Sequence, residues 1–224
     1  MAPGVRCALE HGGGAPVIVD QTADLDTAVP SLLKGGYYHA GQVCVSVQRV
    51  FAHASIVDQL TQRLAEGAEQ LVVGDAVNAD TEVGPLILPR EVDRVEAWVS
   101  EAIEAGAECV TGGKRLGDTT YAPTVLLNPP AETNVSTREI FGPVVCVYPY
   151  TDLQDAIDMA NSLDVARICG DRLDATAVMI NDHTAFRVDW MPFAGRKTSG
   201  YGIGGIGYTM HDMVQIKMIV TKHS

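Results

Sequence analysis

The hydrophobic residues of this chain recur with two spacings. In some segments they alternate with polar residues, and in others they recur every three to four positions. Short apolar or alternating runs bounded by turn residues predict strands. One such run begins directly after Cys44 and covers residues 45–51. The other predicted strands cover residues 16–19, 109–113, 122–127, 143–150 and 176–182.

The longer period predicts helices between these strands, over residues 24–35, 55–71, 90–105 and 152–161. Between the second and third helices, residues rich in Gly, Asn, Asp and Pro predict a surface loop. Strands that alternate with helices form parallel βαβ units, with helices on both faces of the sheet. The predicted fold class is therefore α/β, a three-layer αβα arrangement with a mainly parallel sheet.

The composition fits this class and excludes several kinds of partner. A chain of 224 residues, 46% of them hydrophobic, can bury the core of one large α/β domain or two small ones. A net charge of −12 with only 16 scattered basic residues argues against nucleic acid as a partner. The chain has neither a long apolar run nor the regions of a signal peptide, so membrane insertion and secretion are not expected.

The cysteines and histidines of this chain do not have the spacing of metal ligands. Five cysteines without short paired spacing predict neither a disulfide framework nor a zinc site, and they suit the reducing cytoplasm. His39 and His183 lack further ligands at suitable spacing, so no metal site is expected. We therefore expect a cytoplasmic protein. The cysteines are Cys7, Cys44, Cys109, Cys146 and Cys169.

Cys44 and Glu10 are the candidate nucleophile and base. Gly41 and Gln42 predict a sharp turn that places the Cys44 thiol at the start of a strand, where it can meet a substrate. Three glycines follow Glu10 at residues 12–14, and backbone without side chains lets a ligand approach closely. Because an ordinary thiol is mostly protonated at neutral pH, backbone amides or cofactor charge must favour its thiolate. Two alternatives stay open, a buried packing cysteine and a solvated carboxylate.

Four segments in order carry a resemblance to a known family. EHGGGAPVIV, GQVC, REIFGPVV and MPFAGRKTSG resemble the catalytic half of the NAD(P)-dependent aldehyde dehydrogenase superfamily, from about Leu9 to the C-terminus. The resemblance implies an aldehyde dehydrogenase catalytic domain over residues 1–207. It also implies oxidation of an aldehyde to a carboxylic acid, with NAD or NADP as hydride acceptor. Cys44 would form the thiohemiacetal and thioester, and Glu10 would activate the water that releases the acid.

The same resemblance implies the residues that contact cofactor and substrate. Glu139 would hold the nicotinamide ribose hydroxyls, and Phe141 would pack against the nicotinamide end. Without the motif, Glu139 is equally a turn carboxylate and Phe141 a core residue. The implied cofactor contacts also include Gly12 and Gly13. The implied substrate-proximal residues are Phe193, in a loop where Ala194 replaces the usual glycine, and Asn181, for which a turn role is an alternative.

The substrate class follows from two stretches, around Cys44 and over residues 181–195. They look like the branch that oxidises small hydroxylated or anionic aldehydes such as lactaldehyde, glyceraldehyde phosphate or phosphonoacetaldehyde. Arg187 is the candidate for the distal anion, because a guanidinium binds a carboxylate or phosphate through two parallel hydrogen bonds. The alternative is a surface ion pair of Arg187 with Asp182 or Asp189.

The glycine-rich stretch near the C-terminus is not read as a dinucleotide fingerprint. Gly200, Gly202 and Gly205 match G-x-G-x-x-G, but they lack the strand, helix and following acidic residue that the motif requires.

The chain departs from the family pattern in two places. The family has a dinucleotide-binding domain before its glutamate motif, so this chain is expected to lack that domain and to bind NAD or NADP weakly alone. Between residues 161 and 177 it is expected to lack one strand. Residues 208–224 are expected to form an oligomerisation tail whose final strand, 217–220, adds to a neighbouring subunit of a homo-oligomer. The alternative function is a truncated, inactive paralogue that acts as an interaction protein.

Overall fold

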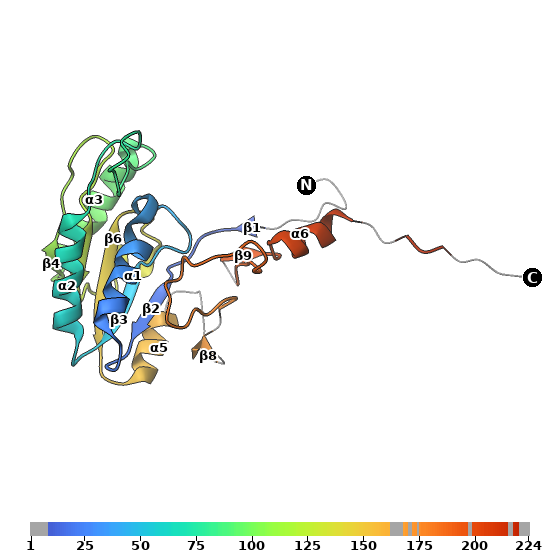
Figure 1. Cartoon of the computed structure of the whole chain (residues 1–224). Coiled ribbons are helices and arrows are strands. Elements are labelled where there is room, and N and C mark those ends of the chain that lie inside the picture. Colours follow the sequence, from blue (N-terminus) through green and yellow to red (C-terminus); the bar gives the residue numbers. More distant parts are fainter. Residues whose placement is uncertain are drawn as a thin grey trace, which may run out of the picture.

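The computed structural model describes residues 9–161, 168–169, 172–173, 175–196, 199–214 and 217–219 (Figure 1). Its centre is a five-stranded sheet in the order β2-β3-β6-β5-β4. The first four of these strands run parallel, and β4 pairs antiparallel with β5 at one edge. The prediction of a mainly parallel sheet is therefore confirmed. The strands are β2 Pro16–Val19, β3 Arg49–His53, β6 Val144–Tyr150, β5 Thr124–Leu127 and β4 Glu108–Thr111.

The predicted helices form close to their predicted bounds. The first begins after Asp24, whose side chain accepts a hydrogen bond from the Asp26 N–H at 3.0 Å. It runs past the predicted end because Gly35 and Gly36 let the helix lie close to the sheet: a Cβ on Gly36 would come within 2.6 Å of Val145. The helices are α1 Leu25–Tyr37, α2 Val57–Gln70, α3 Pro89–Glu104, α4 Asn134–Thr137 and α5 Leu153–Asn161.

Neighbouring residues of the central strands face opposite sides of the sheet, and both sides are covered. Val145 of β6 faces α1, where it lies against Gly36. Arg49 of β3 faces α5, donating hydrogen bonds to the carbonyl oxygens of Met159 and Ala160 at 3.2 and 3.1 Å. The structure thus has the predicted three αβα layers.

The core lies on both faces of β3, β5 and β6. Strands covered on both sides are continuous apolar runs in the sequence, and these runs predicted their positions. α2 adds Leu60 and Leu64, both fully buried against these strands. The central strands contribute Val50, Phe51, Ala52, Val125, Leu126, Val144, Val145, Cys146 and Val147.

The N-terminal and C-terminal parts meet beside the sheet. β1 (Leu9–Glu10) pairs antiparallel with β9 (Gly200–Tyr201), and α6 (Ile206–Met213) follows and projects away from the main body (Figure 1). A short antiparallel pair, β7 (Ile168–Cys169) and β8 (Arg172–Leu173), follows α5. Because α6 begins at Ile206, the predicted start of the tail at residue 208 falls inside a helix.

Two predicted elements are wrong in the described residues. The strand predicted from residue 45 begins only at Arg49, since the segment before it is a turn. Residues 176–182 are irregular, and Thr176 Oγ1 donates to the Ala194 carbonyl at 2.6 Å, which attaches this segment to a loop rather than to the sheet. Residues 217–219 of the predicted final strand carry no regular structure in the single chain, and the strand that they were predicted to add to a neighbouring subunit stays a prediction.

The predicted missing strand falls between residues 161 and 177, largely outside the described residues. No helix in the described ranges combines the length and apolar composition needed to cross a membrane.

Candidate active site

Cys44 lies on a loop between α1 and β3, and a tight left-handed turn leads into it. His39, Ala40 and Gly41 have φ values of 50°, 55° and 70°. A Cβ on Gly41 would lie 2.1 Å from the Gly142 carbonyl oxygen, so only glycine fits this close approach. The predicted sharp turn before Cys44 is therefore confirmed.

Hydrogen bonds hold residues 42–48, here named the Cys44 loop, against α1 and against residues far along the chain. Ser46 Oγ and the Val47 N–H both donate to the Gly35 carbonyl, at 3.1 and 3.0 Å. Thr184 Oγ1 donates to the Val45 carbonyl at 2.7 Å. These bonds to the end of α1 explain why residues 45–48 do not join the strand. They leave the Cys44 thiol half-buried next to a cavity.

Burial is the largest factor that raises the pKa of the Cys44 thiol above its ordinary value. The carboxylates of Glu10 and Glu139 raise the pKa further, because a second negative charge nearby disfavours the thiolate. Hydrogen bonds from the backbone N–H groups of Cys44 and Val45 act in the opposite direction. The carboxylates near Cys44 therefore favour the protonated thiol. Backbone amides or cofactor charge were expected to favour the thiolate, and this chain itself supplies the backbone amides.

Glu10 lies exposed at the rim of the same cavity, on the short strand β1. Its backbone is placed by pairing with Gly200, where a Cβ would lie 2.1 Å from the Leu9 carbonyl oxygen. The next residue, His11, donates its N–H to the Ser199 carbonyl at 2.8 Å. The C-terminal part of the chain thus holds Glu10 close enough to Cys44 to influence the thiol's ionisation.

Glu139 lies on the loop before β6, close to the glycines that follow Glu10. Gly12 has a φ of 94°, and a Cβ there would lie 2.1 Å from Glu139 Oε2. Burial raises the pKa of Glu139, and a hydrogen bond from the Gly13 N–H partly offsets this effect. Its Oε1 atom is buried and has no hydrogen-bond partner within the described part of the chain. A buried unpaired acceptor is rare and suits a hydroxyl donor on a ligand.

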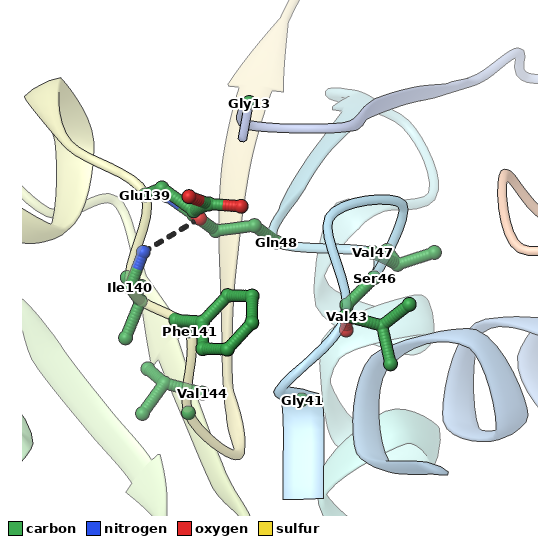
Figure 2. Close-up of a pocket in the computed structure, with 11 residues that line it drawn as sticks. Gly13, Gly41, Val43, Ser46, Val47, Gln48, Glu139, Ile140, Phe141 and Val144 are labelled. Carbon is green, nitrogen blue, oxygen red and sulfur yellow. Dashed lines mark hydrogen bonds between the residues drawn. The ribbon is translucent and has the colours of Figure 1, made fainter. Parts of the chain in front are cut away.

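Phe141 follows in the same loop with a φ of 49° and its ring 41% exposed. The alternative of a core residue is therefore wrong. Figure 2 shows Glu139 and Phe141 on one side of a small pocket, with Gly13 at its edge and Val43 of the Cys44 loop on the other side.

Two neighbouring cavities that share Gly13 contain every residue predicted for the site. The small pocket of Figure 2 is lined by Gly13, Glu139 and Phe141 among others. The second cavity, of about 1260 Å³, is lined among others by Glu10, Gly12, Gly13, Cys44, Asn181, Arg187 and Phe193.

The residues predicted near the substrate, Asn181, Arg187 and Phe193, line the larger cavity together with Cys44. The Arg187 guanidinium stacks on the Phe193 ring at 4.8 Å and donates to the Met191 carbonyl at 3.4 Å. No ion pair joins Arg187 to Asp182 or Asp189 among the described residues, so the predicted surface pairing does not form. Asn181 is exposed with a φ of 58°, so it both forms a turn and faces the cavity.

The literal glycine motif takes no part in a nucleotide-binding unit here. Gly200 belongs to a two-residue antiparallel strand, and Gly205 precedes α6, so the parallel βαβ context is missing. In the described ranges, no group of three or more His, Cys, Asp or Glu side chains could hold a metal ion.

Three polar residues support the site through bonds that the sequence does not reveal, although Gln42 was predicted to form the turn before Cys44. Gln42 donates to the Pro85 carbonyl at 3.2 Å and accepts from the Ile87 N–H at 2.9 Å. Gln48 binds the loop that carries Glu139, and Thr184 binds the Cys44 loop. The signal for Gln48 was a glutamine two positions before the apolar residues 50–52 of a buried strand.

A half-buried cysteine lies beside two carboxylates in the cavities of a three-layer α/β domain. This arrangement is typical of proteins in which a cysteine thiol can act as a nucleophile. A family model described as the aldehyde dehydrogenase family matches residues 2–219, and the chain belongs to this family.

Among its relatives is a 3-sulfolactaldehyde dehydrogenase from Priestia aryabhattai, 36% identical over 228 residues, which are 96% of this chain and 48% of that protein. A glyceraldehyde-3-phosphate dehydrogenase from Methanocaldococcus jannaschii, solved with NADP, matches with a TM-score of 0.89 at 36% identity, covering 96% and 50% of the two chains. Aldehyde dehydrogenase 21 from Physcomitrella patens, solved with its reaction product succinate, matches with a TM-score of 0.86 at 34% identity, covering 92% and 46%. The chain thus has the aldehyde dehydrogenase fold and spans about half the length of these relatives.

Proposed function

We propose that this chain is the catalytic part of an NAD(P)-dependent aldehyde dehydrogenase, which oxidises an aldehyde to a carboxylic acid. The observation that carries the proposal is the convergence of Cys44 and Glu10 on one cavity, with the unpaired Oε1 of Glu139 in the pocket beside it. Family membership supports the same reaction.

In this proposal the Cys44 thiolate attacks the carbonyl carbon of the aldehyde, and a thiohemiacetal forms on the sulfur. Bound NAD or NADP supplies the acceptor for the hydride whose loss turns this adduct into a thioester. Glu10 then takes a proton from a water molecule that attacks the thioester carbon. The carboxylic acid leaves, and the thiol is free for another cycle. The backbone N–H groups of Cys44 and Val45 stabilise the thiolate through hydrogen bonds.

The residues present fit one end of the cofactor. Glu139 Oε1 is a buried acceptor suited to a ribose hydroxyl, and the exposed Phe141 ring offers a face for a planar ring. Gly12 and Gly13 leave room for close approach beside the carboxylate. We propose that these contacts alone bind NAD or NADP weakly, and that a dinucleotide-binding portion outside these 224 residues completes the site.

We propose small anionic aldehydes as the substrate class. The three relatives described above act on a sulfonated aldehyde or a phosphorylated aldehyde, or release a dicarboxylate, so each handles a small anion. Arg187 supplies a cation on the wall of the Cys44 cavity, and it forms no ion pair within the described residues that would occupy it.

We also propose that the chain assembles with copies of itself in the cytoplasm, through residues 208–224 together with the start of α6. Large apolar side chains on and after α6 are exposed in the single chain, and such a patch favours association. The same surface would serve the alternative function, an inactive interaction protein. The exposed residues are Ile206, Tyr208, Met210, Met213, Val214, Met218 and Ile219.

Hydrolysis of 4-nitrophenyl acetate tests the proposal, since this reaction needs a nucleophile and a base but no hydride acceptor. We expect Cys44→Ser to abolish turnover, and Glu10→Gln to retain a rapid first acylation followed by slow release. Cys109→Ser, a change at another half-buried thiol, is the matched control and should keep turnover. Undiminished turnover in Cys44→Ser would refute the catalytic assignment and leave the interaction protein as the better function.

A further inference from the structure

Gln48 is a buried amide at the end of the Cys44 loop, with only 5% of its surface exposed. Its Oε1 accepts a hydrogen bond from the Ile140 N–H at 2.8 Å, which Figure 2 shows as a dashed line. Its Nε2 donates to the carbonyl oxygens of Arg138, at 2.6 Å, and of Val135, at 3.4 Å. All three hydrogen bonds of this amide thus go to residues 135–140, that is, to α4 and to the loop after it that carries Glu139.

The two shorter bonds lie on either side of Glu139 in the sequence. The Ile140 backbone group is a donor and the Arg138 group an acceptor, so they fix which end of the Gln48 amide faces each of them. The amide therefore holds the backbone immediately before and immediately after Glu139. With this backbone fixed, the Glu139 carboxylate meets the Gly13 N–H on one oxygen and presents the other unpaired in the pocket.

Gln48 itself has a rigid support. Its carbonyl oxygen accepts a hydrogen bond from the Cys146 N–H of β6 at 2.9 Å, and β3 begins at the next residue, Arg49. It is also only four positions after Cys44 in the chain. One side chain, anchored in the sheet, therefore links the Cys44 loop to the loop of Glu139.

We propose that Gln48 is a positioning residue that aims the Glu139 carboxylate and sets its place relative to Cys44. The positioning of Glu139 does not depend on the proposed function. Its expected effect on cofactor binding does, because that effect requires Glu139 to contact the cofactor. Gln48 acts through the two backbone groups beside Glu139 and has no role in the chemistry at the thiol.

The chain offers a matched control in Gln42, the other glutamine of the same loop. Gln42 also makes three hydrogen bonds: it donates to the carbonyl oxygens of His39 and Pro85 and accepts from the Ile87 N–H, and none of these groups belongs to the Glu139 loop. The change Gln→Met keeps the approximate length of either side chain and removes its amide. A general loosening of the Cys44 loop would appear in both variants, whereas positioning of Glu139 should be lost only in Gln48→Met.

The first experiment is a carbon-13 NMR titration of the Glu139 carboxyl in the full chain, assigned by its absence in Glu139→Gln. Burial holds the pKa of Glu139 above its ordinary value. In Gln48→Met the freed loop should let water reach the carboxylate, so its pKa should fall toward the ordinary value, while Gln42→Met leaves it unchanged. The variant Gln48→Leu, which also removes the amide and adds no charge, should give the same fall and serves if the Met variant does not fold.

The second experiment measures kinetics in the protein completed by its dinucleotide-binding portion, with NAD or NADP varied. Gln48→Met should raise the KM for the cofactor at least about tenfold, equal to about 1.4 kcal/mol, with the rate of Cys44 alkylation retained. Glu139→Gln should cost far less in the Gln48→Met background than in the wild type, because both changes remove one interaction.

The two experiments separate failure of this inference from failure of the proposed function. An unchanged Glu139 pKa in Gln48→Met, or equal shifts in the two Gln→Met variants, would overturn the positioning role. A protein that oxidises no aldehyde would overturn the proposed function, while the NMR titration would still decide what Gln48 does.

Discussion

Burial and the two carboxylates beside Cys44 together raise the pH at which its thiol reacts. Burial, then Glu10 and Glu139, raise the pKa of the thiol, so its thiolate forms only above the ordinary pKa of a cysteine. Glu10→Gln removes one negative charge and should therefore lower this pKa. We expect alkylation of Cys44 by iodoacetamide at neutral pH to become several-fold faster, with the whole pH profile moved to lower pH, as followed by peptide mass spectrometry.

Cys109 is the internal control for that measurement, because burial alone raises the pKa of its thiol. Its alkylation profile should be the same in the wild type and in Glu10→Gln. A Cys44 profile that stays in place, or moves to higher pH, would show that Glu10 does not act on the thiol.

Gly12 makes room for the Glu139 carboxylate. Gly12→Ala would place a Cβ 2.1 Å from Glu139 Oε2, so the carboxylate must move. In the completed enzyme we expect the KM for NAD or NADP to rise, with Cys44 alkylation retained. Gly106→Ala is a matched control, since Gly106 also has a positive φ, of 113°, but nothing lies within 4 Å of its Cβ. Both variants should lose stability through backbone strain, about 1–3 kcal/mol, and Gly12→Ala should lose more because of its contact with Glu139. An equal change in KM in the two variants would contradict the role of Gly12.

The sequence identified the residues that line the two cavities better than the residues that support them. Motifs located Cys44, Glu10 and Glu139, because each of them stands in a local sequence pattern that can be recognised without the fold. Gln48 and Thr184 have almost no recognisable pattern in the sequence around them. Their partners lie 92 and 139 positions away, so their roles depend on the assembled fold.

At the level of elements, local patterns predicted helices α1, α2, α3 and α5 and the buried strands, because those elements depend on spacing within the element. Neither α4 nor α6 was predicted. The errors arose where tertiary bonds outweigh local preference. Residues 45–48 alternate like a strand, yet Ser46 and Val47 are bonded to the end of α1. Residues 176–182 are apolar like a strand, yet Thr176 is bonded to Ala194.

The packing of α2 on the sheet supports a prediction about stability. Leu64 of α2 is fully buried, and Leu64→Ala would remove apolar contacts and leave a cavity in the core. We expect the free energy of unfolding to fall by about 2–5 kcal/mol, measured by urea denaturation. Leu116→Ala, at a side chain that is half exposed, should change it by about 0.5 kcal/mol or less. Equal losses in the two variants would show that α2 does not pack on the core as described.

For the whole molecule, the apolar surface of α6 leads to a prediction about assembly. We expect the chain to sediment as an oligomer, and the double change Met210→Asp, Met213→Asp to shift it toward the monomer, because charge opposes burial of this surface. Val77→Asp alters another exposed apolar residue in the loop after α2, and it should leave the assembly unchanged. A monomeric wild type at micromolar concentration would exclude assembly through α6.

The hydrogen bonds around Cys44 also bear on when the site comes into existence during folding. The Cys44 loop is fastened to Pro85, Arg138 and Thr184, which follow their partners by 43, 90 and 139 positions. Contacts between such distant residues form late, because long loops of chain must close first. A growing chain on the ribosome that has passed Cys44 still lacks every one of these anchors. The reactive pocket is therefore assembled only after nearly all of this chain has been made.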